Sequence, residues 1–178
     1  VDGADDLMAL AAERSPDPIP DATEGADMLY SSGTTGRPKG VLRALSGEPL
    51  GTTAGLALLG EFLMGMSPES VYLSPAPMYH AAPLKWSLES LALGASVVLM
   101  ERFEPEALLS AIETHGVTHG QFVPTMFVRM LKLPEEVRNR YDVSSLQAII
   151  HAAAPCPEDV KRAMIAWMGP IINEYYAG

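Results

Sequence analysis

The feature that most limits the fold of this chain is a regular alternation of short apolar runs with longer helical patterns. Runs typical of strands occupy residues 71–74, 96–100, 117–123, 147–151 and 171–175. Helical patterns fill the segments between them, at 80–93, 104–115, 125–131 and 158–167. Strand–helix–strand units pair their strands in parallel through right-handed crossovers. The order therefore predicts an α/β fold with a mostly parallel β-sheet and helices on both faces.

The helix at 104–115 is the best delimited of these elements. Pro105 stands near its first position and Gly116 follows its end, where proline and glycine are favoured. Leu109 and Ile112 recur on one side of the helix, which predicts a buried face. The run at 96–100, rich in Val and Leu, is expected to be a buried strand.

The chain before residue 71 has less regular patterns. Residues 1–23 combine acidic residues with a proline cluster, which predicts a short helix followed by an extended linker. A strand is expected at 26–31, near the start of the compact fold. Residues 49–66 have helical spacing, with one apolar face made by Leu56, Leu59, Leu63 and Met66.

Composition and charge exclude several classes of protein. A chain of 178 residues, 48% of them hydrophobic, can build a core without disulfides or metals. Its net charge of −10 repels nucleic acid, so no nucleic-acid partner is expected. The apolar stretches are too short for a transmembrane segment, and the N-terminus does not resemble a signal peptide. With a single cysteine, Cys156, these features favour a cytoplasmic protein.

A segment rich in glycine and hydroxyl residues, at 30–41, gives the clearest indication of a binding site. It reads Tyr-Ser-Ser-Gly-Thr-Thr-Gly-Arg-Pro-Lys-Gly-Val. Its glycines let backbone N–H groups turn toward an anion, its hydroxyls donate hydrogen bonds, and Lys39 adds a positive charge. The spacing does not match a Walker loop. A phosphate-binding loop is one interpretation, and a flexible surface loop is the alternative that composition alone allows.

Every position from 32 to 40 except Arg37 resembles the phosphate loop of the adenylate-forming superfamily, which includes acyl-CoA synthetases, luciferases and peptide-synthetase adenylation domains. Three further segments are similar to that family in the same order: Pro75–His80, residues 103–125, and the pair 152–155 and 173–178. The resemblance implies part of an acyl-CoA synthetase-like N-terminal domain. Residues 26–178 would be the central part of the AMP-binding domain and 1–25 a separate acidic, Pro-rich segment, with the C-terminal domain absent.

The resemblance implies a reaction in two steps. Family members activate a carboxylic acid with ATP to an acyl-adenylate and pyrophosphate, and the synthetases transfer the acyl group to CoA. The implied partners are a small-molecule carboxylic acid, ATP, Mg²⁺ and CoA. Residues 167–176 resemble synthetases for fatty or steroid-type acids. An adenylation domain or acyl-AMP ligase that loads a carrier protein, and a non-catalytic nucleotide-binding module, stay open as alternatives.

The same resemblance assigns roles to individual residues. Catalytic roles fall on Lys39, beside the phosphates, and on His80, beside the acyl carboxylate. The residues expected to bind ATP are Ser31, Ser32, Gly33, Thr34, Thr35, Gly36, Lys39, Ala153, Ala154, Pro155, Glu174, Tyr175 and Tyr176. The residues expected to line the acid pocket are His80, Ala81, His119, Gln121, His151 and Ala152.

Some of these assignments keep an alternative. Glu174 stands where the family places a polar residue near the exocyclic amine of adenine, and an ordinary strand-end carboxylate is an equal interpretation. His151 replaces a small residue, which would narrow or polarise the acyl tunnel. The family's Mg²⁺-binding glutamate and catalytic lysine follow the position of Gly178, so no metal ligand is expected within 1–178. These residues alone are expected to have little ligase activity, and the sequence does not indicate an oligomeric state.

Overall fold

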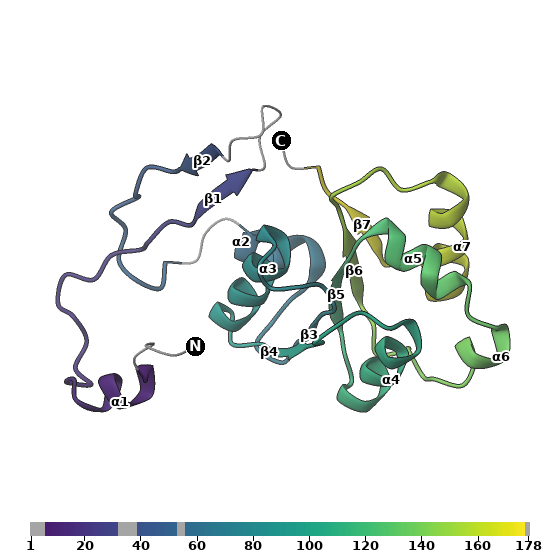
Figure 1. The fold of residues 1–178 in the computed structure, drawn as a ribbon, viewed down its shortest axis with the longest axis horizontal. Coiled ribbons are helices and arrows are strands. Elements are labelled where there is room, and N and C mark those ends of the chain that lie inside the picture. The colour runs from purple at the N-terminus through teal and green to yellow at the C-terminus, as the bar shows by residue number, and fades with distance from the viewer. Residues whose placement is uncertain (1–5, 32–38, 53–55, 177–178) are drawn as a thin grey trace. The chain divides into compact units, whose positions relative to one another are not determined.

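The computed structural model describes residues 6–31, 39–52 and 56–176, and the chain divides into two compact units, Val1–Thr52 and Thr53–Gly178. The first unit contains helix α1 (Leu7–Ala12) and strands β1 (Met28–Ser31) and β2 (Lys39–Leu42) (Figure 1). Asp6 begins α1 by accepting hydrogen bonds from two first-turn amides, which is a favoured N-cap arrangement. The short helix and the first strand agree with the sequence prediction, whereas β2 was not predicted.

The second unit is built on a five-stranded sheet in which every pair is parallel, in the order β4-β3-β5-β6-β7. Its strands are β3 (Val71–Ser74), β4 (Ser96–Leu99), β5 (His119–Phe122), β6 (Ala148–His151) and β7 (Ile172–Glu174). Its helices are α2 (Leu56–Met64), α3 (Ala81–Ala92), α4 (Pro105–His115), α5 (Pro124–Leu131), α6 (Glu135–Arg138) and α7 (Glu158–Met168). The α/β fold with helices on both faces is confirmed.

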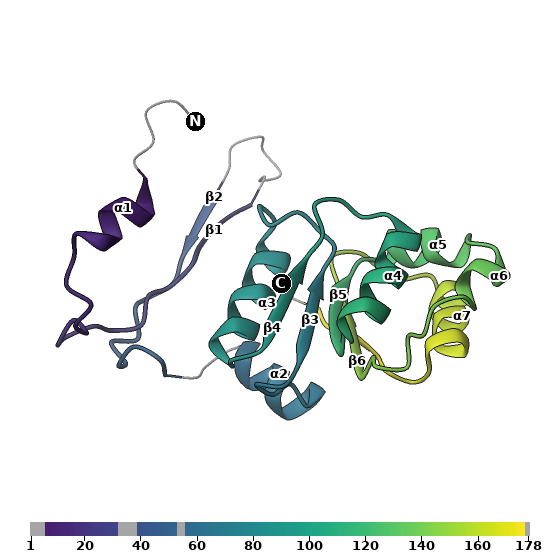
Figure 2. The ribbon, with the colours of Figure 1, turned by 90° about the horizontal axis from the view of Figure 1, so that it is seen from below.

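The direction in which successive strands are added reverses next to β3. The first crossover runs from β3 to β4 at one edge, and the chain then returns past β3 to form β5, β6 and β7. Right-handed crossovers in opposite directions put their helices on opposite faces. Figures 1 and 2 show α2 and α3 on one face of the sheet, with α4, α5 and α7 on the other.

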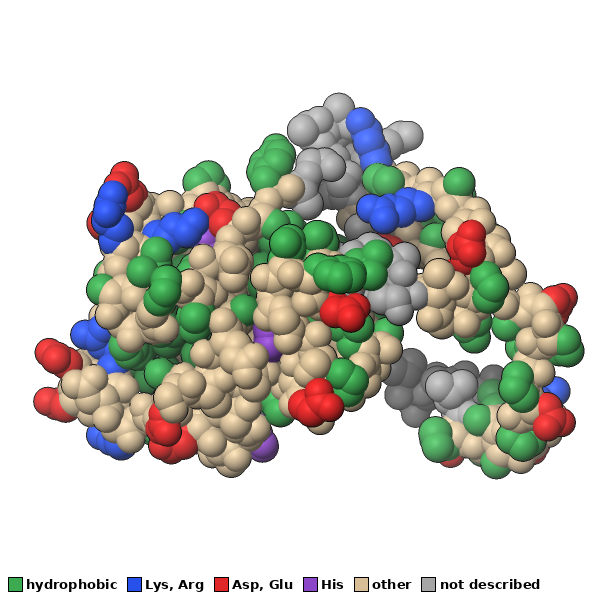
Figure 3. All heavy atoms as spheres, turned by 180° about the vertical axis from the view of Figure 1, so that it is seen from behind, with side chains coloured by type: hydrophobic (Ala, Val, Ile, Leu, Met, Phe, Trp, Pro, Cys, Tyr) green, Lys and Arg blue, Asp and Glu red, His purple; other side chains and the backbone are tan. Residues whose placement is uncertain are grey.

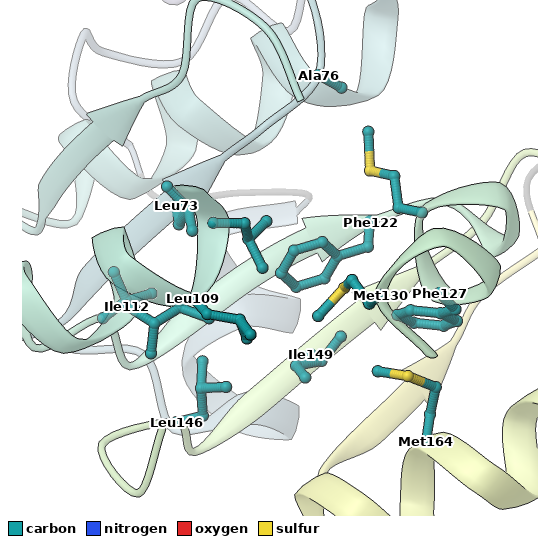
Figure 4. Packing of buried hydrophobic residues seen from close by; sticks show 13 residues of the cluster. Leu73, Ala76, Leu109, Ile112, Phe122, Phe127, Met130, Leu146, Ile149 and Met164 are labelled. Atoms are coloured by element: carbon teal, nitrogen blue, oxygen red, sulfur yellow. The ribbon is translucent and has the colours of Figure 1, made fainter. Parts of the chain in front are cut away.

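Hydrophobic residues fill both interfaces between sheet and helices. On the α4, α5 and α7 face, the strands contribute Leu73, Phe122 and Ile149, which pack with Leu109 and Met130 as Figure 4 shows. The neighbouring strand residues point to the other face, because side chains alternate along a strand. There the core consists of Met66, Tyr72, Trp86 and Ile150. Burial on both faces explains the apolar character of β3 and β6, whereas β5 also buries the polar His119 and Gln121.

The sequence predictions for helix α2 and strand β4 were wrong. Helix α2 is shorter than 49–66: Pro49 forms a β-bridge with Thr23 instead, and after Met64 the chain turns at Gly65, whose φ is 68°. Of its expected apolar face, Leu59 and Leu63 are exposed, and Met66 is buried beyond the end of the helix. Strand β4 is an edge strand with exposed ends rather than a buried strand, because only β3 pairs with it.

Helices α2 and α3 carry exposed hydrophobic side chains on the surface of the second unit. Figure 3 shows green side chains gathered on this part of the surface. They are Leu58, Leu59, Phe62 and Leu63 on α2, with Leu84, Leu88 and Leu91 on α3. Within the described residues, no helix combines the length and the apolarity that crossing a membrane requires.

Candidate functional site

Several of the site residues expected in the second unit follow the carboxyl ends of three of its strands. Pro75–His80 follows β3, residues 152–155 follow β6, and Tyr175 and Tyr176 follow β7. Parallel strands bring their carboxyl ends to one edge of a sheet. In open α/β sheets, ligands bind outside that edge, beside the point where the strand order reverses. Here this point lies between β3 and β5, next to His80.

His80 is the residue immediately before α3. Its backbone is extended, with φ −83° and ψ 145°, and its side chain makes no capping hydrogen bond to the helix. Its backbone N–H donates to the Pro77 carbonyl at 3.1 Å, which fixes the turn after β3. The imidazole is exposed beside the Tyr79 ring, with 4.5 Å between the ring centroids. Ala81 follows as the exposed first residue of α3.

The turn after β6 contains a strained residue. Ala153 has φ 74°, and it is the one residue other than glycine with a positive φ in the described parts of the chain. This region costs a residue with a Cβ about 1–2 kcal/mol. Ala152 is buried, whereas Ala153, Ala154 and Pro155 are exposed. The strain therefore occurs where the chain leaves the sheet and presents three exposed residues.

Glu174, Lys161 and His151 form a polar cluster at the ends of β6 and β7. The Lys161 ammonium donates to Glu174 Oε2 at 2.6 Å, and His151 Nε2 lies 3.9 Å from the same oxygen. The hydrogen bond from Lys161 lowers the pKa of Glu174. Burial, and then the charge of Lys161, lower the pKa of His151 below its ordinary value, which favours a neutral imidazole.

His151 is fully buried on the face covered by α5 and α7. Its ring meets the Phe127 ring edge to face, with 5.5 Å between centroids. Neither ring nitrogen has a hydrogen-bond partner among the residues that the structure describes.

His119 and Gln121 lie on the opposite face of the sheet, under α2. His119 Nε2 is 2.8 Å from the Met64 carbonyl, and Nδ1 is 2.8 Å from the Thr118 hydroxyl. A neutral ring that donates from Nε2 and accepts at Nδ1 satisfies both contacts. Gln121 is buried, and within the described ranges its Oε1 has no partner. The structure therefore does not bring these two residues together with His151, and a shared acid pocket stays a prediction.

Two aromatic residues that sequence reasoning did not assign to a site lie near Tyr175. Its ring meets the Trp86 ring at 6.2 Å between centroids, and Tyr72 belongs to the same cluster. Tyr72 Oη and Trp86 Nε1 are buried without a partner in the described part of the chain. Burial raises the pKa of Tyr72 well above its ordinary value. Tyr176, the next residue, is 95% exposed.

Lys161 is also a residue that sequence reasoning missed. Its partner Glu174 is 13 positions later in the chain, on another element. The prediction that α7 precedes a parallel strand could have indicated such a pair, because a crossover helix packs beside the strand that follows it.

In the first unit, β1 and β2 bring together the two ends of the glycine-rich loop. They pair antiparallel, with Ser31 opposite Lys39 and Tyr30 opposite Gly40. The Tyr30 ring and the Met28 methyl lie over Gly40, where a Cβ would come within 2.8 Å of that methyl. Lys39 is exposed. The expected phosphate-binding residues Ser32, Gly33, Thr34, Thr35 and Gly36 lie outside the described residues.

Comparison with known proteins identifies relatives over nearly the whole chain. The family model described as AMP-binding enzyme matches residues 2–177. A 4-coumarate–CoA ligase of Oryza sativa subsp. japonica is 32% identical over 181 residues, which cover 97% of this chain and 31% of that protein.

Two solved structures are similar in fold and sequence. The inhibitor-bound N-terminal domain of FACL13 from Mycobacterium tuberculosis has a TM-score of 0.73 at 26% identity, covering 98% of this chain and 43% of that one. An amide bond synthetase from Marinactinospora thermotolerans has a TM-score of 0.72 at 29% identity, covering 84% of this chain and 28% of that one. The chain thus spans about a third of the Oryza relative and less than half of either solved chain.

Proposed function

Because the chain belongs to the AMP-binding enzyme family, we propose that the full-length protein containing it is an AMP-forming acid–thiol ligase. A carboxylate oxygen attacks the α-phosphate of ATP, and pyrophosphate leaves. The CoA thiol then attacks the acyl carbon of the acyl-adenylate, which releases AMP and a proton. One observation carries the proposal. The segments around His80, Ala153 and Glu174, which match the family in sequence order, follow strands that end at one edge of a parallel sheet.

The phosphates of ATP are proposed to bind at the loop that joins Ser31 to Lys39. The antiparallel pair β1 and β2 holds the two ends of that loop opposite each other, which supports a common target for Lys39 and the loop. An ammonium group and backbone amides would stabilise the charge of the leaving pyrophosphate without any covalent step on the protein. Mg²⁺ is proposed to accompany the polyphosphate and to neutralise part of its charge.

The acid is proposed to bind beside His80. The backbone N–H groups of Ala81 and Ala82, at the start of α3, and the positive end of the helix dipole favour an anionic carboxylate. The His80 imidazole makes no bond to the helix and is exposed, so it can donate a hydrogen bond to the same carboxylate. Its role would be to position the carboxylate for attack on the α-phosphate.

Adenine is proposed to bind between residues 153–155 and Tyr176. The exposed Tyr176 ring offers a flat apolar face for stacking. Glu174, at the end of β7, would accept a hydrogen bond from the exocyclic amine. In this proposal, residues 26–178 are the central part of the adenylation domain of a cytoplasmic protein.

The proposal also concerns the identity of the acid and of the group that accepts the acyl chain. A fatty or steroid-type acid rests on the likeness of residues 167–176 to synthetases for such acids. The name of the Oryza relative points to an aromatic acid instead. The Marinactinospora structure is that of an amide bond synthetase, so an acceptor other than a thiol must be tested as well.

The test uses the full-length protein with ATP and Mg²⁺. Exchange of labelled pyrophosphate into ATP should depend on the acid, and fatty, steroid-type and hydroxycinnamic acids are compared. AMP release that requires CoA supports the ligase, whereas release that requires a carrier protein or an amine supports another acceptor. Lys39→Ala should abolish most of the exchange, with Arg43→Ala on the same side of the loop as a control for charge. Acid-independent exchange, or full exchange by Lys39→Ala, would refute the assignment.

A further inference from the structure

The ion pair between Lys161 and Glu174 joins helix α7 to the end of strand β7, beside the buried His151. The Lys161 ammonium, on α7, donates to Oε2 of Glu174, at the end of β7. In the described part of the chain, no donor bonds Oε1 of the same carboxylate, and the Glu174 side chain is 44% exposed. One oxygen is therefore held by the protein while the other remains available to a ligand.

The buried imidazole limits where this carboxylate can lie. His151 Nε2 is 3.9 Å from Oε2, and the ring is closed in by Phe127 on its other side. Among the described residues, the charged or titratable groups that face Glu174 are Lys161 from α7, His151 from β6 and the Cys156 thiol from the turn before α7. With His151 neutral, Lys161 supplies the only full positive charge among them. Removing it would leave the carboxylate free to rotate into solvent.

A carboxylate oxygen held in one position distinguishes donors from acceptors. It accepts a hydrogen bond from the exocyclic amine of adenine, whereas it repels the carbonyl oxygen that hypoxanthine carries at the same position. Rejection of the wrong group is strongest where the protein group cannot turn away from it. The Lys161 bond would provide that restraint.

We propose that Lys161 is a positioning residue for nucleobase selection, which holds Glu174 so that Oε1 reads the exocyclic amine of ATP. The inference rests on the proposed function, and in particular on adenine binding beside Glu174. Lys161 itself does not touch the nucleotide in this proposal, and its effect passes entirely through the Glu174 carboxylate.

The experiment compares ATP with inosine triphosphate as substrates of the full-length protein. The measured quantity is the ratio of the two kcat/KM values in acid-dependent release of pyrophosphate. Lys161→Met keeps the aliphatic stem and removes the charge, and Lys161→Arg restores a donor. Arg162→Met is the matched control, because Arg162 is the next residue on α7 and pairs with Glu158 on the exposed side of the helix.

We expect Lys161→Met to lower the preference for ATP about fivefold, mainly through KM for ATP, since a lost charge-assisted restraint is worth about that factor. Lys161→Arg should recover most of the preference, and Arg162→Met should keep all of it. Glu174→Gln should lose preference to a similar degree. An unchanged ratio in Lys161→Met, with or without lower stability or lower kcat, would overturn the inference. A wild-type protein that uses neither nucleotide would instead refute the proposed function.

Discussion

The bond between His119 and the end of α2 gives the sharpest prediction about stability. His119 is fully buried, and its Nε2 donates to the Met64 carbonyl at 2.8 Å, which ties α2 to the centre of the sheet. Replacing His119 with leucine introduces an apolar side chain of similar size and removes that donor. The Thr118 hydroxyl can then donate its proton to the Val71 carbonyl, 3.2 Å away, so the loss falls on the Met64 carbonyl. We expect a destabilisation of about 1–3 kcal/mol, the cost of losing a partly buried hydrogen bond.

The same residue predicts a dependence of stability on pH. Burial lowers the pKa of His119 from its ordinary value of 6.5, although the bond with Met64 opposes the shift. The unfolded chain therefore binds a proton before the folded chain does as the pH falls. The stability that neutral His119 contributes is present above about pH 6.5 and is lost between that pH and the lower pKa of the folded state. His151 acts in the same direction, so His119→Leu should weaken the acid destabilisation without removing it.

The assay is urea unfolding of the full-length protein at about pH 7 and about pH 5, combined with amide hydrogen exchange of α2. His119→Leu should lower the unfolding midpoint at the higher pH, accelerate exchange in α2, and narrow the difference between the two pH values. His115→Leu is the control, because His115 is exposed at the end of α4. Equal amide exchange in α2 for wild type and His119→Leu would refute the role of the His119–Met64 bond in holding α2. An unchanged difference in stability between the two pH values would refute the contribution of His119 to the pH dependence.

Three further substitutions test the packing and the backbone. Met130→Ala should destabilise the protein by about 2–5 kcal/mol in urea unfolding, since Met130 is fully buried in the larger core, and a loss below 1 kcal/mol would contradict that packing. Gly116→Ala should cost about 1 kcal/mol because Gly116 ends α4 with φ 60°, whereas Gly25→Ala, which has open space and no positive φ, should be nearly neutral. Ala153→Gly should raise the thermal midpoint by relieving the φ of 74°, and a lower midpoint would mean that the turn is not strained.

The strands of the second unit could be predicted from the sequence because both faces of the sheet are covered. Burial on two sides makes β3 and β6 mostly apolar, and β3 was predicted at the residues where it occurs. Helix α4 was predicted because Pro105 and Gly116 mark its ends. Local sequence was sufficient in these cases.

Elements whose limits depend on the rest of the molecule were predicted less well. The apolar spacing of 49–66 suggested a long helix with a buried apolar face. Leu59 and Leu63 of α2 are exposed, so the spacing of apolar residues did not predict which of them are buried. Strand β2 is short, contains Gly40, and is fixed by pairing with β1 rather than by its own pattern. Among the site residues, the motif order located His80 and Glu174 at the edge of the sheet. The partner of Glu174 on α7 required the tertiary structure.

The alternation of side chains in β5 and β6 has a consequence for how this protein could change its substrates. His119 and Gln121 lie on one face of the sheet, and His151 with Lys161 and Glu174 lies on the other. Among the described residues, the two groups share no side-chain partner, which favours additive effects of substitutions on opposite faces. Substitutions could then be selected on one face while the side chains of the other face stay as they are, and an engineer could randomise the two faces in separate libraries.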